Sequence, residues 1–314
     1  MKKASVILSS ALVLGTLLAG CGNNNNAGNA AATNAPAAAT TAPAADATTA
    51  PAADATTAPA ANAGTETGKY QDGTYYGTVD VDAETGWQTF VLLTVEGGKI
   101  TKADWNAFNT KTAGDLKKKV SEDGNYGLVK IGGAQSEWHE QAAKAEAFLI
   151  EKQDPAALAF DAEGHTDAVS GVSVHVSDFV GAAQAALAAG PVQVGPYKDG
   201  GYKAEGEMDA ESGWKSTVAV SVAGGNVVAV NFSGVNAAGD DKKQYSVDGK
   251  YGMKAGGASA EWHEEIALAE KYFLENKGAA PTLDAEGKTD AISGVSIHVG
   301  EYFTLAQKAL EGAK

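Results

Sequence analysis

The order of apolar and polar residues predicts a strand-rich segment that occurs twice in this chain. Phe90 to Val95 and Val218 to Val222 are rich in β-branched and other apolar residues, and a Gly-Gly pair follows each run. Such a run before a glycine turn is typical of a β-hairpin, so we predict return strands over Ile100 to Phe108 and Val227 to Phe232. An Asp-Gly turn, a further strand and a Gly-Trp element precede each hairpin.

Behind each hairpin comes a lysine-containing polar region, and then the apolar residues change to a helical spacing that puts them on one face. They are Trp138, Ala142, Ala145 and Leu149 in the first half and Trp262, Ile266, Ala269 and Phe273 in the second. A last helix is predicted over Asp178 to Ala189 and over Glu301 to Glu311. Between the two helices of each half, the segment Asp-Ala-Val/Ile-Ser-Gly-Val-Ser-Val/Ile-His-Val predicts a turn that runs into a strand or a helix N-terminus.

The two halves are copies of one sequence. Matching stretches begin at Tyr70 and Tyr197, and they include an Asp-Ala-Glu-x-Gly-Trp element and a Glu-Trp-His-Glu element. Copies of this length can each bury a core of their own. We therefore predict an α+β fold in which residues 68–190 and 197–314 are tandem small domains, each with an antiparallel sheet and two C-terminal helices.

The N-terminus has the pattern of an exported lipoprotein. Lys2 and Lys3 precede a short apolar stretch, and Leu-Ala-Gly comes directly before Cys21. The stretch is shorter than the roughly 20 apolar residues of a transmembrane helix. It resembles a bacterial lipobox, so residues 1–21 are predicted to be a signal peptide, with Cys21 carrying a lipid such as palmitate. An ordinary signal peptide that ends near a cysteine is the alternative.

Residues 22–67 are rich in Ala, Thr and Pro and offer almost nothing large and apolar to bury. We predict a disordered stalk that holds the two domains at the extracytoplasmic face of the bacterial cell membrane. Net charge is −15, which disfavours binding to nucleic acid. Cys21 is the only cysteine, which excludes zinc ribbons and iron–sulfur clusters, and the chain has no arginine to hold an anion.

The glycine-containing segment is the first candidate site. Hydroxyls and backbone N–H groups before a helix suit a phosphate, although they also cap helices. The residues are Ser170, Gly171 and Ser173 in the first copy and Ser293, Gly294 and Ser296 in the second.

With its Asp-Gly-x-Tyr opening, Gly-Trp element, Gly-Gly hairpin and Ser-Gly-Val-Ser segment, each copy resembles the FMN-binding domain family. That family includes two-domain lipoproteins that export electrons, and the resemblance implies an FMN site at this segment. Family members can attach FMN to the last hydroxyl of the segment, but His175 and His298 stand at that position. An imidazole cannot form that phosphoester, so the expected flavin is held non-covalently.

Two histidines recur in both copies and open a second hypothesis. If they converge, His139 with His175 and His263 with His298 could ligate haem or a metal, with Trp138 and Trp262 against the cofactor. Structural histidines and core tryptophans are the alternative.

Three functions follow from these patterns. The first is an electron carrier with a flavin or related cofactor, a membrane electron donor and an extracellular acceptor. The second is a haem- or metal-binding lipoprotein, and the third is a cofactor-free interaction lipoprotein. A carrier or binding protein is favoured over a turnover enzyme, because no nucleophile–base pair stands out.

Overall fold

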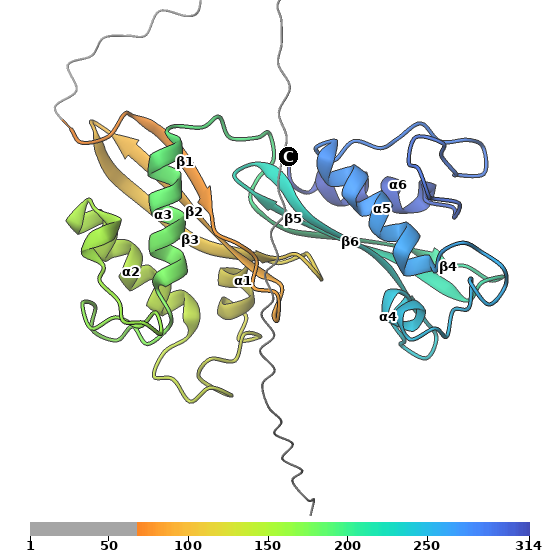
Figure 1. The fold of residues 1–314 in the computed structure, drawn as a ribbon, viewed down its shortest axis with the longest axis horizontal. Helices are drawn as coiled ribbons and strands as arrows, with labels where there is room; N and C mark the ends of the chain where they lie inside the picture. The colour runs from red at the N-terminus through yellow and green to blue at the C-terminus, as the bar shows by residue number, and fades with distance from the viewer. Residues whose placement is uncertain (1–67) are drawn as a thin grey trace, which may run out of the picture. The chain divides into compact units, whose positions relative to one another are not determined.

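The computed structural model describes residues 68–314, which Figure 1 shows as a ribbon. The predicted signal peptide, Cys21 and the stalk lie outside the described residues. Within residues 68–314, no helix has the length and apolar character that a membrane crossing requires. We refer to residues 68–190 as copy 1 and to residues 197–314 as copy 2.

Copy 1 begins with a three-stranded antiparallel sheet in the order β1-β2-β3. Its strands are β1 (Gly73–Thr78), β2 (Trp87–Glu96) and β3 (Lys99–Asn109). The β2–β3 turn is Gly97-Gly98, with φ of 59° and 71°. Both values lie in the left-handed region that a two-residue hairpin turn requires and that glycine adopts without a steric penalty. The Gly-Gly prediction is therefore confirmed in its physical detail.

Copy 2 repeats this sheet with β4 (Gly200–Met208), β5 (Trp214–Ala223) and β6 (Asn226–Asn236) in antiparallel order. The register shifts at the same place in both hairpins, between Thr94 and Val95 in β2 and between Ser221 and Val222 in β5. Equivalent irregularities show that the duplication extends to the backbone.

Helices follow each sheet. In copy 1 they are α1 (Lys117–Glu122), α2 (Trp138–Lys152), the short 3-10 turn η1 (Pro155–Ala157) and α3 (Ser177–Ala189). In copy 2 they are α4 (Lys242–Val247), α5 (Trp262–Glu275) and α6 (Gly300–Glu311). Helix α3 contacts β1 and β2, and α2 contacts β3; α6 and α5 contact the sheet of copy 2 in the same way.

These elements confirm the predicted α+β class, the two tandem sheets and the two long helices after each. The short helices α1 and α4 were not predicted, because the sequence there shows only a polar, lysine-containing stretch. The segment between the long helices is a turn that leads into α3 or α6, as one of the two predicted outcomes.

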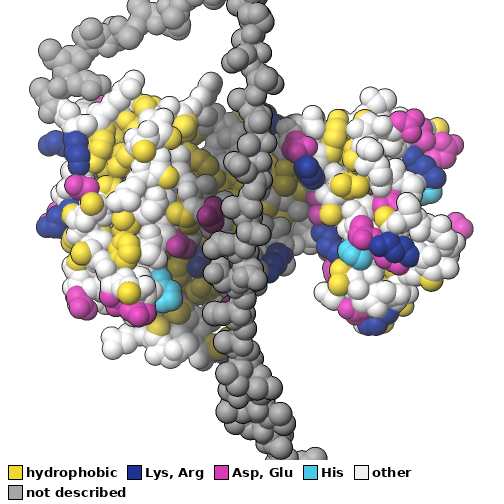
Figure 2. All heavy atoms as spheres, in the orientation of Figure 1, with side chains coloured by type: hydrophobic (Ala, Val, Ile, Leu, Met, Phe, Trp, Pro, Cys, Tyr) yellow, Lys and Arg dark blue, Asp and Glu magenta, His cyan; other side chains and the backbone are white. Residues whose placement is uncertain are grey.

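Each copy has its own core. One cluster of buried residues lies wholly within copy 1, around Trp105, Trp138 and Phe179, and another lies wholly within copy 2, around Phe232, Trp262 and Phe303. A smaller cluster draws on both copies through Phe90, Phe108, Leu116, Ala223 and Ala229. On the face drawn in Figure 2, acidic and basic side chains are interspersed among uncharged ones.

Candidate functional site

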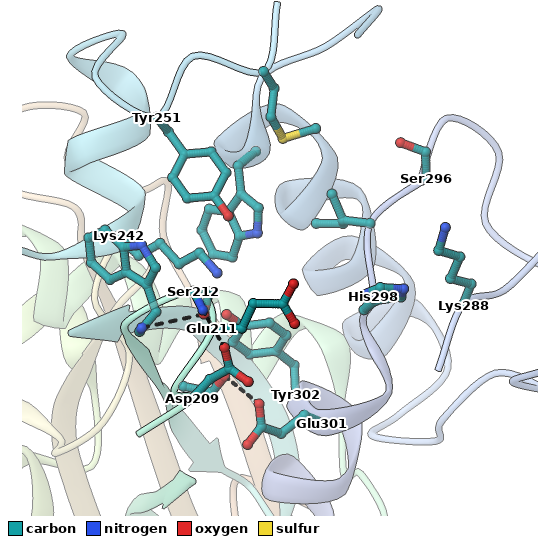
Figure 3. Close-up of a pocket in the computed structure, with 15 residues that line it drawn as sticks. Asp209, Glu211, Ser212, Lys242, Tyr251, Lys288, Ser296, His298, Glu301 and Tyr302 are labelled. Atoms are coloured by element: carbon teal, nitrogen blue, oxygen red, sulfur yellow. Dashed lines mark hydrogen bonds between the residues drawn. The ribbon is translucent and has the colours of Figure 1, made fainter. Parts of the chain in front are cut away.

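Each copy contains a pocket built from equivalent elements. Its walls come from the Gly-Trp turn, the start of the short helix, the start of the following long helix and the segment before the last helix. The pocket measures about 760 Å³ in copy 2 and about 380 Å³ in copy 1. Figure 3 shows the larger one.

Most lining positions of one pocket have a counterpart in the other. The pairs are Asp82 and Asp209, Thr85 and Ser212, Trp87 and Trp214, Thr89 and Ser216, Lys117 and Lys242, Tyr126 and Tyr251, Leu128 and Met253, Trp138 and Trp262, Ser173 and Ser296, Val174 and Ile297, His175 and His298, and Asp178 and Glu301. The chemical type is the same or closely similar in every pair.

An aspartate forms the turn that presents the first tryptophan. Asp82 Oδ1 accepts hydrogen bonds from Glu84 N at 2.9 Å and Thr85 N at 2.8 Å, and Asp209 Oδ1 accepts one from Ser212 N at 2.6 Å. These backbone donors lower the pKa of both carboxyl groups, because they favour the ionised form. The predicted Gly-Trp element is therefore a charged turn at the pocket rim.

A lysine at the start of the short helix points at three aromatic rings. In copy 2, Lys242 Nζ lies 5.9 Å from the ring centroid of Trp214, 5.3 Å from that of Tyr251 and 4.7 Å from that of Trp262. Lys242 is only 9% exposed, and burial lowers the pKa of its amine to about 8. Each such cation–π contact is worth roughly 0.5–2 kcal/mol.

Copy 1 has the same caged lysine. Lys117 Nζ lies 5.8 Å from the ring centroid of Trp87, 4.9 Å from that of Tyr126 and 4.8 Å from that of Trp138. The next lysine along each helix behaves differently: Lys118 is ion-paired with Asp104 and Glu146, and Lys243 is ion-paired with Glu270. Adjacent lysines thus have separate roles: the first faces the pocket, and the second forms ion pairs that connect the short helix to the following long helix and, in copy 1, to a strand.

The backbone amides of the glycine-containing segment are already engaged. In copy 1, Gln141 Oε1 accepts from Ser173 N at 2.7 Å and from Val174 N at 3.2 Å. In copy 2, Glu265 Oε2 accepts hydrogen bonds from the equivalent amides, Ser296 N and Ile297 N, and the bond from Ile297 N measures 3.2 Å. Gln141 and Glu265 are both 1% exposed.

These bonds change the view of the predicted phosphate site. An internal carboxamide or carboxylate occupies the donors that the sequence assigned to an anion. Ser173 and Ser296 do line the pockets, whereas Ser170, Gly171, Ser293 and Gly294 are exposed and are not among the lining residues.

The structure places the repeated histidines in two different surroundings. His139 Nδ1 lies 2.9 Å from Ser121 Oγ and His263 Nδ1 lies 2.9 Å from Ser246 Oγ, and neither histidine lines either of these two pockets. His175 and His298 do line the pockets. Each described pocket therefore receives one of its two repeated histidines.

The neighbour of His175 is His165, with ring centroids 4.4 Å apart. Copy 2 has Lys288 at that position, and Lys288 lines the larger pocket. Within residues 68–314, no group of three or more His, Cys, Asp or Glu side chains is placed to hold a metal ion.

Trp138 and Trp262 are both core residues and pocket residues. They are 3% and 2% exposed, and the same indoles form part of the lysine cages. The two alternatives considered for them from the sequence are thus not exclusive. Sequence reasoning missed the caged lysines, although their repetition at equivalent positions is visible in the duplication.

Two buried side-chain polar atoms lack a hydrogen-bond partner within residues 68–314, and both belong to residues that line a pocket. They are Trp105 Nε1 in copy 1 and Tyr302 Oη in copy 2. Burial raises the pKa of Tyr302, and the neighbouring Ser216 hydroxyl donates its hydrogen bond to Glu301 at 2.6 Å.

The two unpartnered donors come from different elements. Trp105 of β3 stacks on Phe179 of α3 with ring centroids 4.8 Å apart. In copy 2 the strand residue is Phe232 and the helix residue is Tyr302, with centroids 5.7 Å apart. Each copy therefore has one buried, unpartnered donor beside its pocket, on the strand in copy 1 and on the last helix in copy 2.

No protein-family model and no curated protein matches this chain. The chain is similar to the solution structure of a protein from Clostridium thermocellum, with 50% identity over 38% of this chain and 91% of that chain, at a TM-score of 0.31. It is also similar to the crystal structure of a protein from Clostridium perfringens, with 25% identity over 38% of this chain and 88% of that chain, again at a TM-score of 0.31.

Proposed function

We propose that this protein is a membrane-anchored extracytoplasmic electron carrier that holds a flavin non-covalently in the pocket of each copy. The observation that carries the proposal is the repetition of one aromatic, lysine- and histidine-bearing pocket at equivalent positions of both copies. A framework kept for packing alone would not need equivalent polar residues at the rim.

The size and walls of the pockets support a planar aromatic ligand. Volumes of about 760 and 380 Å³ fall within the range of roughly 300–1,000 Å³ that is typical of small-molecule sites. Two tryptophans and a tyrosine are common to both pockets, and Trp105 is added in copy 1 and Tyr302 in copy 2. Such rings stack on flat ligands. A bound flavin would supply one- and two-electron redox chemistry, while the protein supplies binding, orientation and shielding from water.

The segment before the last helix supports non-covalent binding. His175 and His298 occupy the position of the flavin-accepting hydroxyl in the FMN-binding family that the sequence resembles. Ser173 Oγ and Ser296 Oγ, the hydroxyls two residues before these histidines, hydrogen-bond to Gln141 and Glu265. An ester to either serine would break this internal contact.

The anchor belongs to the same proposal. A lipid on Cys21 and a stalk over residues 22–67 would hold both pockets outside the membrane, between a membrane donor and an extracellular acceptor. Incorporation of labelled palmitate into the full chain, lost in Cys21→Ser, tests this part alone.

The absorbance spectrum of the purified full-length protein tests the flavin part. We expect a flavin spectrum, either as isolated or after incubation with FMN, and we expect acid to release the flavin intact. A Soret band in its place would favour the haem hypothesis, and a colourless protein that does not bind FMN would overturn the proposal.

A further inference from the structure

The caged lysines are incompletely satisfied cations. An ammonium group has three N–H donors, yet neither Lys117 Nζ nor Lys242 Nζ makes an ion pair or side-chain hydrogen bond within residues 68–314. Aromatic rings stabilise the charge but accept no conventional hydrogen bond. Burying a charge without a hydrogen-bonded partner is costly. This applies most strongly to Lys242, which is 9% exposed, whereas Lys117 is only partly buried.

In copy 2 the Glu301 and Asp209 carboxylates stabilise the Lys242 ammonium through space, but neither forms an ion pair with it. In copy 2, Asp209 is engaged by a backbone N–H of its own turn, and Glu301 accepts the hydroxyl of Ser216. Figure 3 shows Lys242 and Tyr302 on the same hollow, so the unpartnered hydroxyl and the unpartnered ammonium face one space.

The loop that the sequence favoured for an anion is unsuited to that role. Its amides in copy 2 already bind the Glu265 carboxylate, which would also repel a second anion. In copy 1 the equivalent amides donate their hydrogen bonds to the neutral side chain of Gln141.

We propose that Lys117 and Lys242 are the anion-binding residues of the two pockets and that each receives an oxyanion of the ligand, such as a phosphate or a carboxylate. The inference rests on the proposed function only for the identity of the ligand, where FMN phosphate would be the oxyanion. Its physical basis, a lysine that faces the pocket and has no hydrogen-bond acceptor, is independent of the flavin.

Binding should depend on pH in copy 2. The Lys242 amine, with its pKa near 8, is charged below that pH and increasingly neutral above it. The contribution of Lys242 to oxyanion affinity should therefore be at its full value below about pH 8 and should fall as the pH rises further. The other titratable groups that line this pocket are Asp209, Glu211, Tyr251, Lys288, His298, Glu301 and Tyr302.

The test compares FMN with riboflavin, which lacks the phosphate, on the purified full-length protein. Lys117→Gln, Lys242→Gln and the double variant should weaken FMN binding about tenfold or more per site and leave riboflavin binding nearly unchanged. Lys242→Arg stays charged, so it should retain FMN binding, and its affinity for FMN should not fall above pH 8. Lys250→Gln is the control, because Lys250 is exposed and pairs with Asp248 at 2.8 Å.

The failures of the two proposals are distinguishable. Suppose that FMN binds and the glutamine variants weaken the binding of FMN and of riboflavin equally, or weaken the binding of neither. The lysine assignment is then overturned, and the flavin-carrier proposal stands. If no flavin binds, inorganic phosphate and benzoate are the probes, read by tryptophan fluorescence. Lysine-dependent binding of either anion supports the anion site without a flavin, and absence of such binding overturns it. Circular dichroism shows whether each variant is folded.

Discussion

Copy 1 and copy 2 line their pockets with nearly the same types of residue, but the residues behind the lining differ. The caged lysine, its three rings and the aspartate turn are the same in both. Behind them, the acceptor for the loop amides is Gln141 in one copy and Glu265 in the other. The unpartnered donor is Trp105 on a strand in one copy and Tyr302 on a helix in the other.

This difference shows which features the duplication has constrained. A carboxamide and a carboxylate can hold the same two amides, and an indole and a phenol can each leave one donor beside the pocket. Residues behind the pocket have therefore changed while their physical effect has persisted. The lysine and its rings have not changed, which indicates that their chemical identity matters.

The largest expected effect comes from the residues that serve as core and cage at once. Trp138→Ala and Trp262→Ala should each destabilise their own copy by about 3–5 kcal/mol, because each removes a buried indole and leaves a cavity. Since the two main cores are separate, denaturant unfolding should split, with the altered copy unfolding first.

Phe160→Ala is the control for this pair. Phe160 is 44% exposed, so its removal should change the unfolding free energy by less than about 0.5 kcal/mol. A single transition at the wild-type midpoint for either tryptophan variant would contradict the separate cores.

The next prediction separates the effect of the caged lysine on folding stability from its effect on ligand binding. Lys242→Met keeps the apolar stem and removes the unpaired charge, so in the absence of ligand it should raise the unfolding free energy by on the order of 1–3 kcal/mol at pH 7. The same change should abolish the oxyanion preference.

The sign of its pH dependence follows from the amine. The folded-state pKa of Lys242 is about 8 against an ordinary value of 10.5, so between these values the unfolded chain binds more protons. Wild-type stability should therefore rise from pH 8 to pH 10.5 relative to Lys242→Met. The advantage of methionine should be greatest below pH 8, and an advantage that grew with pH would contradict the assignment.

The sequence alone predicted the sheets and the long helices because their signals are local. The Gly-Gly pair sets the hairpin turn, and the apolar face that begins at Trp138 sets the helix. It did not predict α1 or α4, six-residue helices whose placement depends on tertiary contacts such as the Lys118 ion pairs.

The candidate site was predicted only in part. Ser173, His175 and Trp138 and their counterparts do line the pockets, but the partner of the loop amides is Gln141, far away in sequence on α2. A polar residue on the buried side of a helix gives no sequence signal of which loop it will meet. His139 was paired with His175 on their repetition alone, and the structure gives His139 to Ser121.

A smaller effect concerns the loop itself. Gln141→Leu and Glu265→Leu should each cost about 1–3 kcal/mol, since two partly buried amides lose their acceptor. Glu265→Gln should cost less, because a carboxamide already performs this task in copy 1, and Gln141→Glu tests the reverse exchange. Chemical denaturation of the four variants gives the comparison; an equal loss for Glu265→Gln and Glu265→Leu would show that the charge is essential.

The smallest expected effect distinguishes a donor held for a ligand from one used in folding. Tyr302→Phe removes a hydroxyl that has no partner, so the free protein should be unchanged or stabilised by up to about 1 kcal/mol. Tyr202→Phe in the same copy removes a hydroxyl that donates to Lys198 O at 2.7 Å and should cost about 0.5–1.5 kcal/mol. With ligand present, the order should reverse: Tyr302→Phe should weaken binding, and Tyr202→Phe should not. Thermal unfolding with and without FMN measures both, and a loss of stability in ligand-free Tyr302→Phe would show that the hydroxyl already has a structural role.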